Sequence, residues 1–359
     1  MLHCCTVELR VQRSLVGGLL SLEERRSNSV SQQPTTDDHM RKAMLFYNPL
    51  SGRGRERRLA DVEAARSVLW GAGVEARSAP TRAPSDATDQ TELAIADGCD
   101  TIFACGGDGT IHDVLQGLVG TETALGVIPL GTANSLAHDL GLPLAPAAAA
   151  RAALNAERRR IAVGRIEYQD FFGNRALRYF TVTAGIGVDA YLFYKLDPFI
   201  KRSFGMAAYC AKANHLWLTH KMENFSVEFE NEGGSHQAAV SQLLAVRISN
   251  FGGVLRELAP GASLERDDLR LVLFRTQSRV KYLRYVLRGL FGADWKIPGI
   301  DLVYSASAVC QDAVASSGKP RILVEADGEL LGSLPAAISM VPDALTILMP
   351  DPHERERPR

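Results

Sequence analysis

The sequence predicts two domains, an α/β domain built on a parallel sheet and, after it, a mainly antiparallel β-sandwich domain. Its 359 residues are enough for two domains of ordinary size. Between residue 43 and about residue 156, short apolar runs alternate with segments of helical spacing, as in a parallel sheet covered on both faces. Beyond that point strand-like runs dominate, which favours antiparallel pairing. We therefore place the α/β domain at 43–157 and the β domain at 158–335.

The α/β domain begins with a short apolar run, Met44–Tyr47, that ends at Asn48-Pro49. Its strands are expected at 44–47, 74–78, 101–105 and 125–129. Its helices are expected at 56–71, 85–96, 111–119, 133–140 and 146–154, with Ser85 as the N-cap of the second. Ligands bind beyond the carboxyl ends of such strands, so the residues that follow the strands are the first candidates for a site.

The β domain reads as a series of short strands with two helical interruptions. The strands are expected at 161–168, 178–184, 225–230, 240–250, 269–275, 300–309, 321–326 and 345–349. The helices are expected at 203–219 and 278–290. The second combines an apolar stripe with four basic residues and no acidic one: Val280, Leu283, Leu287 and Leu290; Arg279, Lys281, Arg284 and Arg288. Either the stripe packs on the β domain, or the basic face meets anionic lipid headgroups.

The two ends of the chain look unlike the rest. Residues 1–42 are interpreted either as a disordered leader or as upstream sequence read from too early a start, since Met40 opens a compact stretch. The tail at 351–359 is charged and contains proline, which predicts fraying.

Composition excludes several classes of protein. A net charge of −1 disfavours nucleic-acid binding through a bulk cationic surface. Six cysteines without a C-x-x-C pair indicate reduced thiols in a cytoplasmic protein. No apolar run reaches the roughly 18 residues of a membrane-spanning helix, so membrane contact is expected to be peripheral. The histidines show no ligand spacing, and His112 and His138 are predicted to lie on helix surfaces.

Four stretches concentrate the chemistry, three of them between an expected strand and an expected helix. These three are Asn48–Gly52, Cys105–Thr110 and Pro129–Ser135. Glycine lets the backbone turn close to a ligand, and the following helix offers free N–H groups, so phosphate is the expected ligand. Asp108 suits a phosphate that carries Mg²⁺. Each stretch alone could be an ordinary turn, but three on successive strand ends are hard to obtain by accident.

The fourth stretch, Glu325–Glu329, places carboxylates on both sides of a turn late in the chain. By itself it would read as the charged tip of a hairpin. A Walker-type phosphate loop is excluded because no G-x-x-x-x-G-K-[ST] occurs.

Together these stretches resemble the diacylglycerol kinase catalytic-domain family, bacterial lipid kinases related to sphingosine and ceramide kinases. The motifs, in the family's order and spacing over roughly 43–350, are NPLSG (48–52), GGDGTIHDVLQGL (106–118), PLGTANSLAHDLGLP (129–143) and VEADGE (324–329). The resemblance implies a phosphofructokinase- and NAD kinase-like ATP-binding domain, a β-sandwich lipid-substrate domain, and a C-terminal segment, 336–350, that packs back on the first domain.

The resemblance also implies site residues. The positions expected to contact ATP are Asn48, Pro49, Leu50, Ser51, Gly52, Arg53, Arg58, Thr81, Gly106, Gly107, Asp108, Gly109, Thr110, Ile111, His112, Asp113, Gly131, Thr132 and Asn134. The catalytic acids are expected to be Asp327, Glu329 and Asp108, of which any could be the base. Leu264, Asp267 and Leu269 match a structural Mg²⁺ site that uses the two leucine carbonyls.

Two departures stand out. Ser135 replaces an aspartate that many members use in a water-and-Mg²⁺ network between the glycine turns, so this network must differ. Asp268 replaces a glycine common in the structural metal site.

The resulting expectation is ATP- and Mg²⁺-dependent phosphoryl transfer to a lipid hydroxyl by a cytoplasmic, peripherally membrane-associated enzyme. The acceptor could be diacylglycerol or a sphingoid-like lipid, and a homodimer is compatible with the sequence. An NAD kinase-like enzyme is disfavoured because Ser135 follows Asn134 where that family has glutamate. A non-catalytic lipid- or nucleotide-binding regulator is the other alternative, and the presence of Asp327 and Glu329 argues against it.

Overall fold

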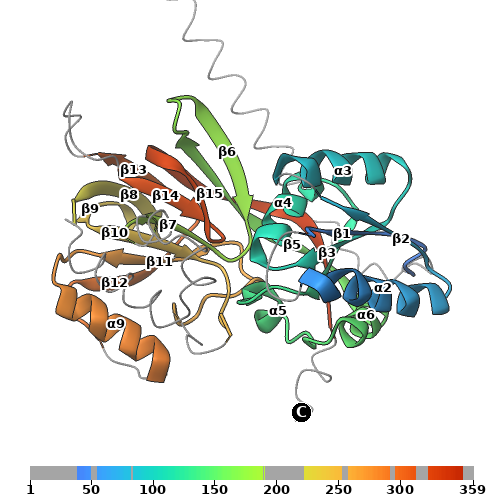
Figure 1. The fold of residues 1–359 in the computed structure, drawn as a ribbon. Coiled ribbons are helices and arrows are strands. Elements are labelled where there is room, and N and C mark those ends of the chain that lie inside the picture. Colours follow the sequence, from blue (N-terminus) through green and yellow to red (C-terminus); the bar gives the residue numbers. More distant parts are fainter. Residues whose placement is uncertain are drawn as a thin grey trace, which may run out of the picture. The chain divides into compact units, whose positions relative to one another are not determined.

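A computed structural model describes residues 39–49, 55–81, 84–188, 190, 222–252, 258–291, 296–312 and 322–350 (Figure 1). Residues 40–359 form one compact unit, distinct from residues 1–39. The predictions for residues 1–38, for the helix at 203–219 and for the tail at 351–359 lie outside the described residues. In the part that is described, no helix has the length and apolar character needed to cross a bilayer.

The first lobe is a parallel sheet in the order β2-β1-β3-β4. Its strands are β1 (Lys42–Tyr47), β2 (Glu75–Pro80), β3 (Thr101–Gly106) and β4 (Ala124–Pro129). Its helices are α2 (Arg55–Gly71), α3 (Pro84–Ala96), α4 (Asp108–Leu118), α5 (Ser135–Asp139) and α6 (Pro146–Leu154). Every residue of β3 and β4 is buried, because helices cover both faces.

Alternation along β3 divides the core of this lobe in two. Ile102 and Ala104 pack with residues of α3 and α4, whereas Phe103 and Cys105 pack with residues of α2 and α6. The α/β architecture expected from the sequence is confirmed.

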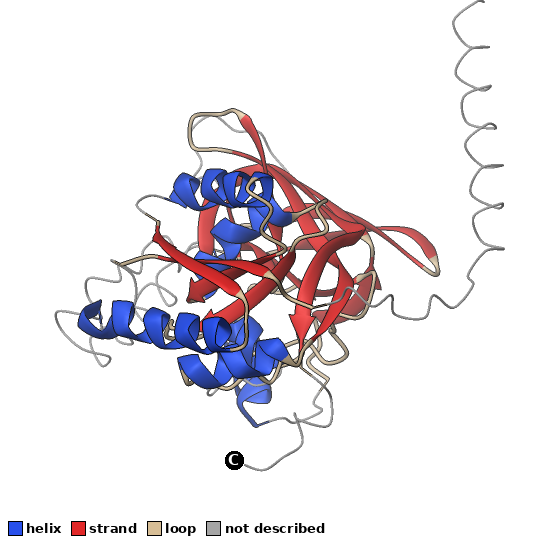
Figure 2. Cartoon of the chain, turned by 90° about the vertical axis from the view of Figure 1, so that its right-hand side faces the viewer, coloured by secondary structure: helices blue, strands red, loops and turns tan. Residues whose placement is uncertain are grey.

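The second lobe is an antiparallel sandwich, with helix α9 outside it (Figures 1 and 2). Its elements are β5 (Glu157–Gln169), β6 (Arg175–Phe180), β7 (Thr183–Gly187), β8 (Phe225–Asn231), β9 (Gly234–Val240), β10 (Gln242–Val246), β11 (Leu269–Phe274), α9 (Arg279–Phe291), β12 (Ile300–Ser305), β13 (Ser307–Asp312), β14 (Leu323–Ala326) and β15 (Glu329–Met349). Apolar side chains from both layers form its core, and a separate cluster fills the space between α9 and β10–β12.

The last strand, β15, belongs to both lobes. It pairs antiparallel with β14, β13 and β5, and near its end it pairs in parallel with β4, with Thr346 opposite Ala124. The sheets of the two lobes therefore form one continuous hydrogen-bonded sheet.

Two predicted strands are each two strands in the structure. The runs expected at 178–184 and 300–309 break near Thr181 and Ala306. The run expected at 240–250 corresponds to β10, and β9, which ends at Val240, was not foreseen. At the break near Ala306, the Ser305 hydroxyl donates to the Glu230 carbonyl, which gives the chain a polar corner between strands. Apolar runs do not reveal such corners, because the residues on both sides are equally strand-like.

Candidate active site

Two glycine turns meet at the carboxyl ends of neighbouring strands. Gly106-Gly107 connects β3 to α4, and Gly131 follows β4. The Leu130 N–H donates to the Gly106 carbonyl at 2.8 Å. A Cβ atom at Gly131 would lie 2.3 Å from the Gly107 Cα, so only glycine permits this approach of the two backbones.

The second turn is closed by Asn134, which has a left-handed backbone at φ 52°. Its side-chain oxygen accepts a hydrogen bond from the Gly131 N–H at 2.8 Å, and its amide nitrogen donates to the Gly131 carbonyl at 3.2 Å. Asn134 thus holds the shape of the turn, whereas Thr132 within the turn is exposed and free to face a ligand.

Asp108 joins the two turns directly. Its Oδ1 accepts a hydrogen bond from the Ser135 N–H at 2.7 Å, and its Oδ2 lies 3.5 Å from the Ser135 hydroxyl. Burial raises the pKa of Asp108, and the negative charge of Asp327 adds to the rise. The Ser135 departure therefore leaves the two turns connected through protein hydrogen bonds.

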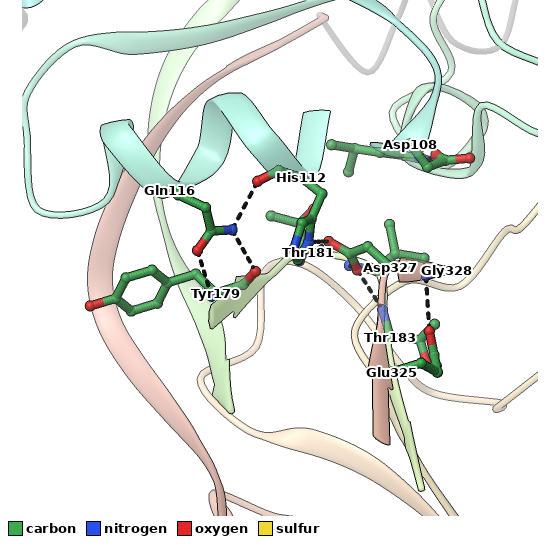
Figure 3. Close-up of polar contacts among 11 residues, drawn as sticks. Asp108, His112, Gln116, Tyr179, Thr181, Thr183, Glu325, Asp327 and Gly328 are labelled. Carbon is green, nitrogen blue, oxygen red and sulfur yellow. Dashed lines mark hydrogen bonds and ion pairs between the residues drawn. The ribbon is translucent and has the colours of Figure 1, made fainter. Parts of the chain in front are cut away.

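On the other lobe, Asp327 occupies the turn between β14 and β15, with φ at 50° (Figure 3). Its carboxylate accepts hydrogen bonds from three successive backbone N–H groups, those of Thr181, Val182 and Thr183, at 2.9 to 3.1 Å. His112 Nδ1 lies 3.5 Å from the same carboxylate. Asp327 is almost fully buried, and three backbone donors fix the position of its carboxylate.

His112 and Gln116 connect α4 to the second lobe. The prediction that His112 lies on the helix surface is wrong: it is only 3% exposed, because the lobe that carries Asp327 covers this face of α4. One turn later, the Gln116 amide donates to the Tyr179 carbonyl and accepts from the Tyr179 N–H (Figure 3). His138, also expected at the surface, is half-buried and packs against Gly252.

Two further carboxyls stand where the lobes meet. Glu329 begins β15 and lies so close to Gly109 that a Cβ there would be 2.6 Å from its Oε1. It reaches solvent, yet partial burial raises its pKa, and the charge of Asp327 contributes. Burial raises the pKa of Asp113, on α4, to about 6, and the charge of Glu329 contributes. Carboxyls with raised pKa values gather at catalytic sites more often than elsewhere.

The other residues expected at the nucleotide follow the same sheet edge. Asn48 and Pro49 follow β1, and Thr81 follows β2, where it is buried. Arg58 is also buried, on α2, and burial lowers its pKa. The side chains of Thr110 and Ile111 are buried, so only their backbone could face a nucleotide. Leu50, Ser51, Gly52 and Arg53 lie outside the described residues.

A catalytic Mg²⁺ is implied by the family resemblance, and the acidic residues fit it. Mg²⁺ commonly uses one or two protein carboxylates together with substrate phosphates and water. The negative charge of Asp327 contributes to the raised pKa values of Asp108 and Glu329, a repulsion that a cation would relieve. Among the described residues no cluster of three or more His, Cys, Asp or Glu forms a ready-made metal cage.

The structural metal site fits less well. The Leu264 carbonyl already accepts a hydrogen bond from Arg247 Nη2 at 3.1 Å, and Arg247 Nη1 donates to the Asp268 carbonyl at 3.1 Å. Arg247 is fully buried, and burial lowers its pKa to about 10. A divalent cation bound to the Leu264 carbonyl would lie beside this guanidinium, so the arrangement does not fit a metal at that oxygen. Asp267 is exposed and Leu269 is buried within β11.

Comparison with known proteins agrees with this geometry. Residues 42–166 match the model of the diacylglycerol kinase catalytic domain, and residues 181–349 match that of the YegS C-terminal NAD kinase beta sandwich-like domain. A crystal structure of a diacylglycerol kinase from Bacillus anthracis has the same fold, with a TM-score of 0.63 at 20% identity, covering 89% of this chain and 99% of that one.

Two relatives named diacylglycerol kinase match over most of their length. The one from Bacillus subtilis is 29% identical over 87% of this chain and 97% of the relative. The one from Mycobacterium tuberculosis is 30% identical over 86% of this chain and 95% of the relative. The chain therefore belongs to the diacylglycerol kinase catalytic-domain family.

Proposed function

We propose that this protein transfers the γ-phosphoryl group of ATP to the hydroxyl of a lipid, diacylglycerol or a sphingoid-like acceptor, at the cytoplasmic surface of a membrane. One observation carries the proposal: two packed glycine turns, suited to phosphate, face the carboxylates of the β14–β15 turn. The names of the relatives support a lipid kinase.

In this proposal, the first lobe binds the nucleotide. The turns at Gly106-Gly107 and Gly131 allow phosphate oxygens to approach the backbone, and the N-terminal end of α4 offers N–H groups and a positive dipole. Phosphoryl transfer depends mostly on positioning and on charge neutralisation. Asp108 would hold Mg²⁺, which supplies positive charge to the phosphates when bound.

Glu329 is the better base of the pair on β14–β15. Its carboxyl reaches solvent and has a raised pKa, so it can accept the proton of the acceptor hydroxyl. The acceptor oxygen then bonds to the γ-phosphorus, the bond to the β–γ bridging oxygen breaks, and ADP leaves. Asp327 already accepts three backbone hydrogen bonds, so its role is to fix the turn that carries Glu329.

Transfer of radiolabel from ATP to a panel of acceptors in mixed micelles tests this assignment. The panel holds diacylglycerol, monoacylglycerol, sphingosine, phosphatidylglycerol and, as the soluble alternative, NAD. Glu329→Gln should lose kcat by about 10²-fold or more while keeping its melting temperature. Asp327→Asn should lose activity together with stability, because its backbone partners lose a charged acceptor.

Glu92→Gln, on the exposed face of α3, is the matched control and should behave as the wild type. Labelling of NAD but no lipid would overturn the lipid assignment, and failure of every acceptor would overturn the kinase. Near-normal kcat in folded Glu329→Gln would remove Glu329 from the role of base.

A further inference from the structure

Helix α9 turns aromatic rather than aliphatic side chains towards the β-sandwich. The rings of Tyr282 and Tyr285 pack on Phe274, with ring centroids 4.5 and 5.0 Å away. The sequence suggests that Val280 and Leu283 belong to a buried stripe, but both are exposed. The face of α9 that meets the sheet is therefore the one that contains Tyr285.

Arg288 follows Tyr285 by one helical turn and is buried with it. The residue is only 7% exposed, and within the described part of the chain no carboxylate pairs with its guanidinium. The guanidinium carbon lies 5.3 Å from the centre of the Tyr285 ring, which compensates part of the charge. Since a buried charge is ordinarily paired, this position calls for an anion.

A cavity of about 670 Å³ lies beside α9 and extends along β12. Its described lining holds one acidic side chain, Asp301, and four basic side chains: Arg270, Arg275, Arg288 and Lys296. The volume is in the range of small-molecule sites, and the excess of positive charge selects an anion.

The four basic side chains are not equally available to a ligand. Arg275 is paired with Asp301 at 3.1 Å. Arg270 donates to a backbone carbonyl at 2.9 Å. Arg288 and the exposed Lys296 are left to face the cavity, so a ligand with two negative charges would match them.

Most of the remaining lining is apolar. It consists mainly of Pro260, Ile297, Pro298, Ile300, Leu302 and Val303. Two cationic side chains beside an apolar wall suit a molecule that joins a doubly charged group to an organic body. A phosphate monoester has this chemistry, because it carries close to two negative charges at neutral pH.

We propose that this cavity binds a soluble phosphate monoester, with its phosphate at Arg288 and Lys296 and its organic body against the apolar wall. No lining residue belongs to the candidate active site, so the proposal does not depend on the kinase reaction. A soluble ester is favoured over a lipid headgroup for two reasons. Arg288 is buried within the protein, and the exposed Val280 and Leu283 are not part of the lining.

Titration calorimetry with phenyl phosphate tests the proposal. Saturating ADP and Mg²⁺ are present, so that the phosphate of the probe is not bound at the glycine turns instead. The full chain should bind the probe. Lys296→Gln should weaken binding about fivefold. Arg288→Gln should weaken it about 30-fold, because its charge is buried.

Phenol and inorganic phosphate each represent one half of the probe. Both should bind more weakly than phenyl phosphate, since each lacks one of the two kinds of contact. Equal binding of either one would overturn the assignment of an ester.

Two variants outside the lining are the controls for charge. Arg284→Gln, at an exposed position on α9, and Arg151→Gln on α6 should bind phenyl phosphate as the wild type does. If Lys296→Gln and a folded Arg288→Gln also bind it unchanged, the proposal fails.

A vesicle assay separates a soluble ligand from a lipid one. Sedimentation with phosphatidate vesicles that depends on Arg288, without binding of phenyl phosphate, would overturn the soluble ester. Because neither assay needs catalysis, failure of this proposal is distinct from failure of the kinase assignment.

Discussion

Acidic side chains are crowded on the two sides of the candidate site, and the crowding has energetic consequences. The pKa values of Asp108, Asp113 and Glu329 are all raised, in each case first by burial and then by a neighbouring carboxylate. Ionisation of these three carboxyls at neutral pH therefore lowers the free energy of unfolding. This cost is consistent with a site arranged for a cation and phosphates.

Asp113 allows this cost to be measured. Its pKa is about 6 in the fold, against about 3.9 in an unfolded chain. Between these values the folded state binds more protons, so the free energy of unfolding falls as pH rises from about 4 to about 6 and stays lower above that range. Asp113→Asn should therefore melt higher than the wild type at pH 7, and the difference should disappear near pH 4.

Thermal melts from about pH 4 to pH 8 check this prediction, because the titration is confined to that window. Glu92→Gln, at an exposed position on α3, is the control and should show no such trend. A difference that stays constant with pH would contradict the raised pKa.

Arg247 supports a second prediction at this scale. Its guanidinium donates to four backbone carbonyls, those of Ala162, Leu264, Arg266 and Asp268. A fixed positive charge at these oxygens makes a structural cation unnecessary there. Chelation with EDTA should leave the melting temperature of the nucleotide-free protein unchanged.

Arg247→Met should lower the melting temperature by several degrees, because each buried carbonyl left unpaired costs about 1–3 kcal/mol. Differential scanning calorimetry with and without EDTA measures both effects. A large drop of the wild type in EDTA would show that a metal, rather than Arg247, holds this loop.

Sequence reasoning identified most of the acidic residues but not their surroundings. The motifs named Asp108, Asp327 and Glu329, whereas His112 was expected at the surface. Periodicity along α4 assigns Ile111, Val114, Leu115 and Leu118 to the core. This periodicity cannot show that the second lobe covers another face of α4. On that face His112 contacts Asp327, which lies 215 residues later in the chain.

At the scale of elements, the strand–turn–helix units of the first lobe were predictable because each is local. Glycine after an apolar strand and a periodic helix after the glycine are both visible in the sequence. The buried face of α9 was not. Leucine and valine look like core residues, but the sheet beneath α9 takes Tyr282 and Tyr285, whose hydroxyls contact the Ser241 hydroxyl and the Leu258 carbonyl.

The contact between the glycine turns gives an element-scale prediction. In Gly131→Ala, the new methyl group would meet the Gly107 Cα at 2.3 Å, so one turn must move away from the other. A displacement of about 1 Å at a reacting centre costs on the order of 10²-fold in rate. We expect such a loss in kcat/KM for ATP, with the melting temperature little changed.

Steady-state kinetics over a range of ATP concentrations measure this loss. Gly71→Ala is the matched control, since no atom lies within 4 Å of the added Cβ at the end of α2. Equal kinetics for the two variants would mean that the turns do not need to touch.

At the scale of the whole molecule, β15 couples the two lobes into one cooperative folding unit. The strand pairs with β5 along most of its length and reaches β4 at Thr346 and Ile347. Neither lobe can lose its structure without breaking hydrogen bonds of the other. Only the last five residues of this strand could be recognised in the sequence, because Pro335, Pro342 and Asp343 interrupt its apolar pattern.

Calorimetry should therefore record a single unfolding transition for residues 40–350, with calorimetric and van't Hoff enthalpies that agree. Ile347→Ala, which removes a fully buried side chain from the first lobe, should shift that transition as a whole. Two separate transitions, with only one displaced by Ile347→Ala, would contradict the coupling.

The position of β15 also orders events during translation. The strands β1 to β4 leave the ribosome well before the partner of β4 on its outer side, which is synthesised more than 200 residues later. Until residues 346 and 347 emerge, the nascent first lobe carries an open strand edge at β4, the kind of edge that recruits other chains. Completion of the first lobe is thus delayed until Thr346 and Ile347 have been synthesised, and a ribosome that stalls before Thr346 releases a fragment prone to aggregation.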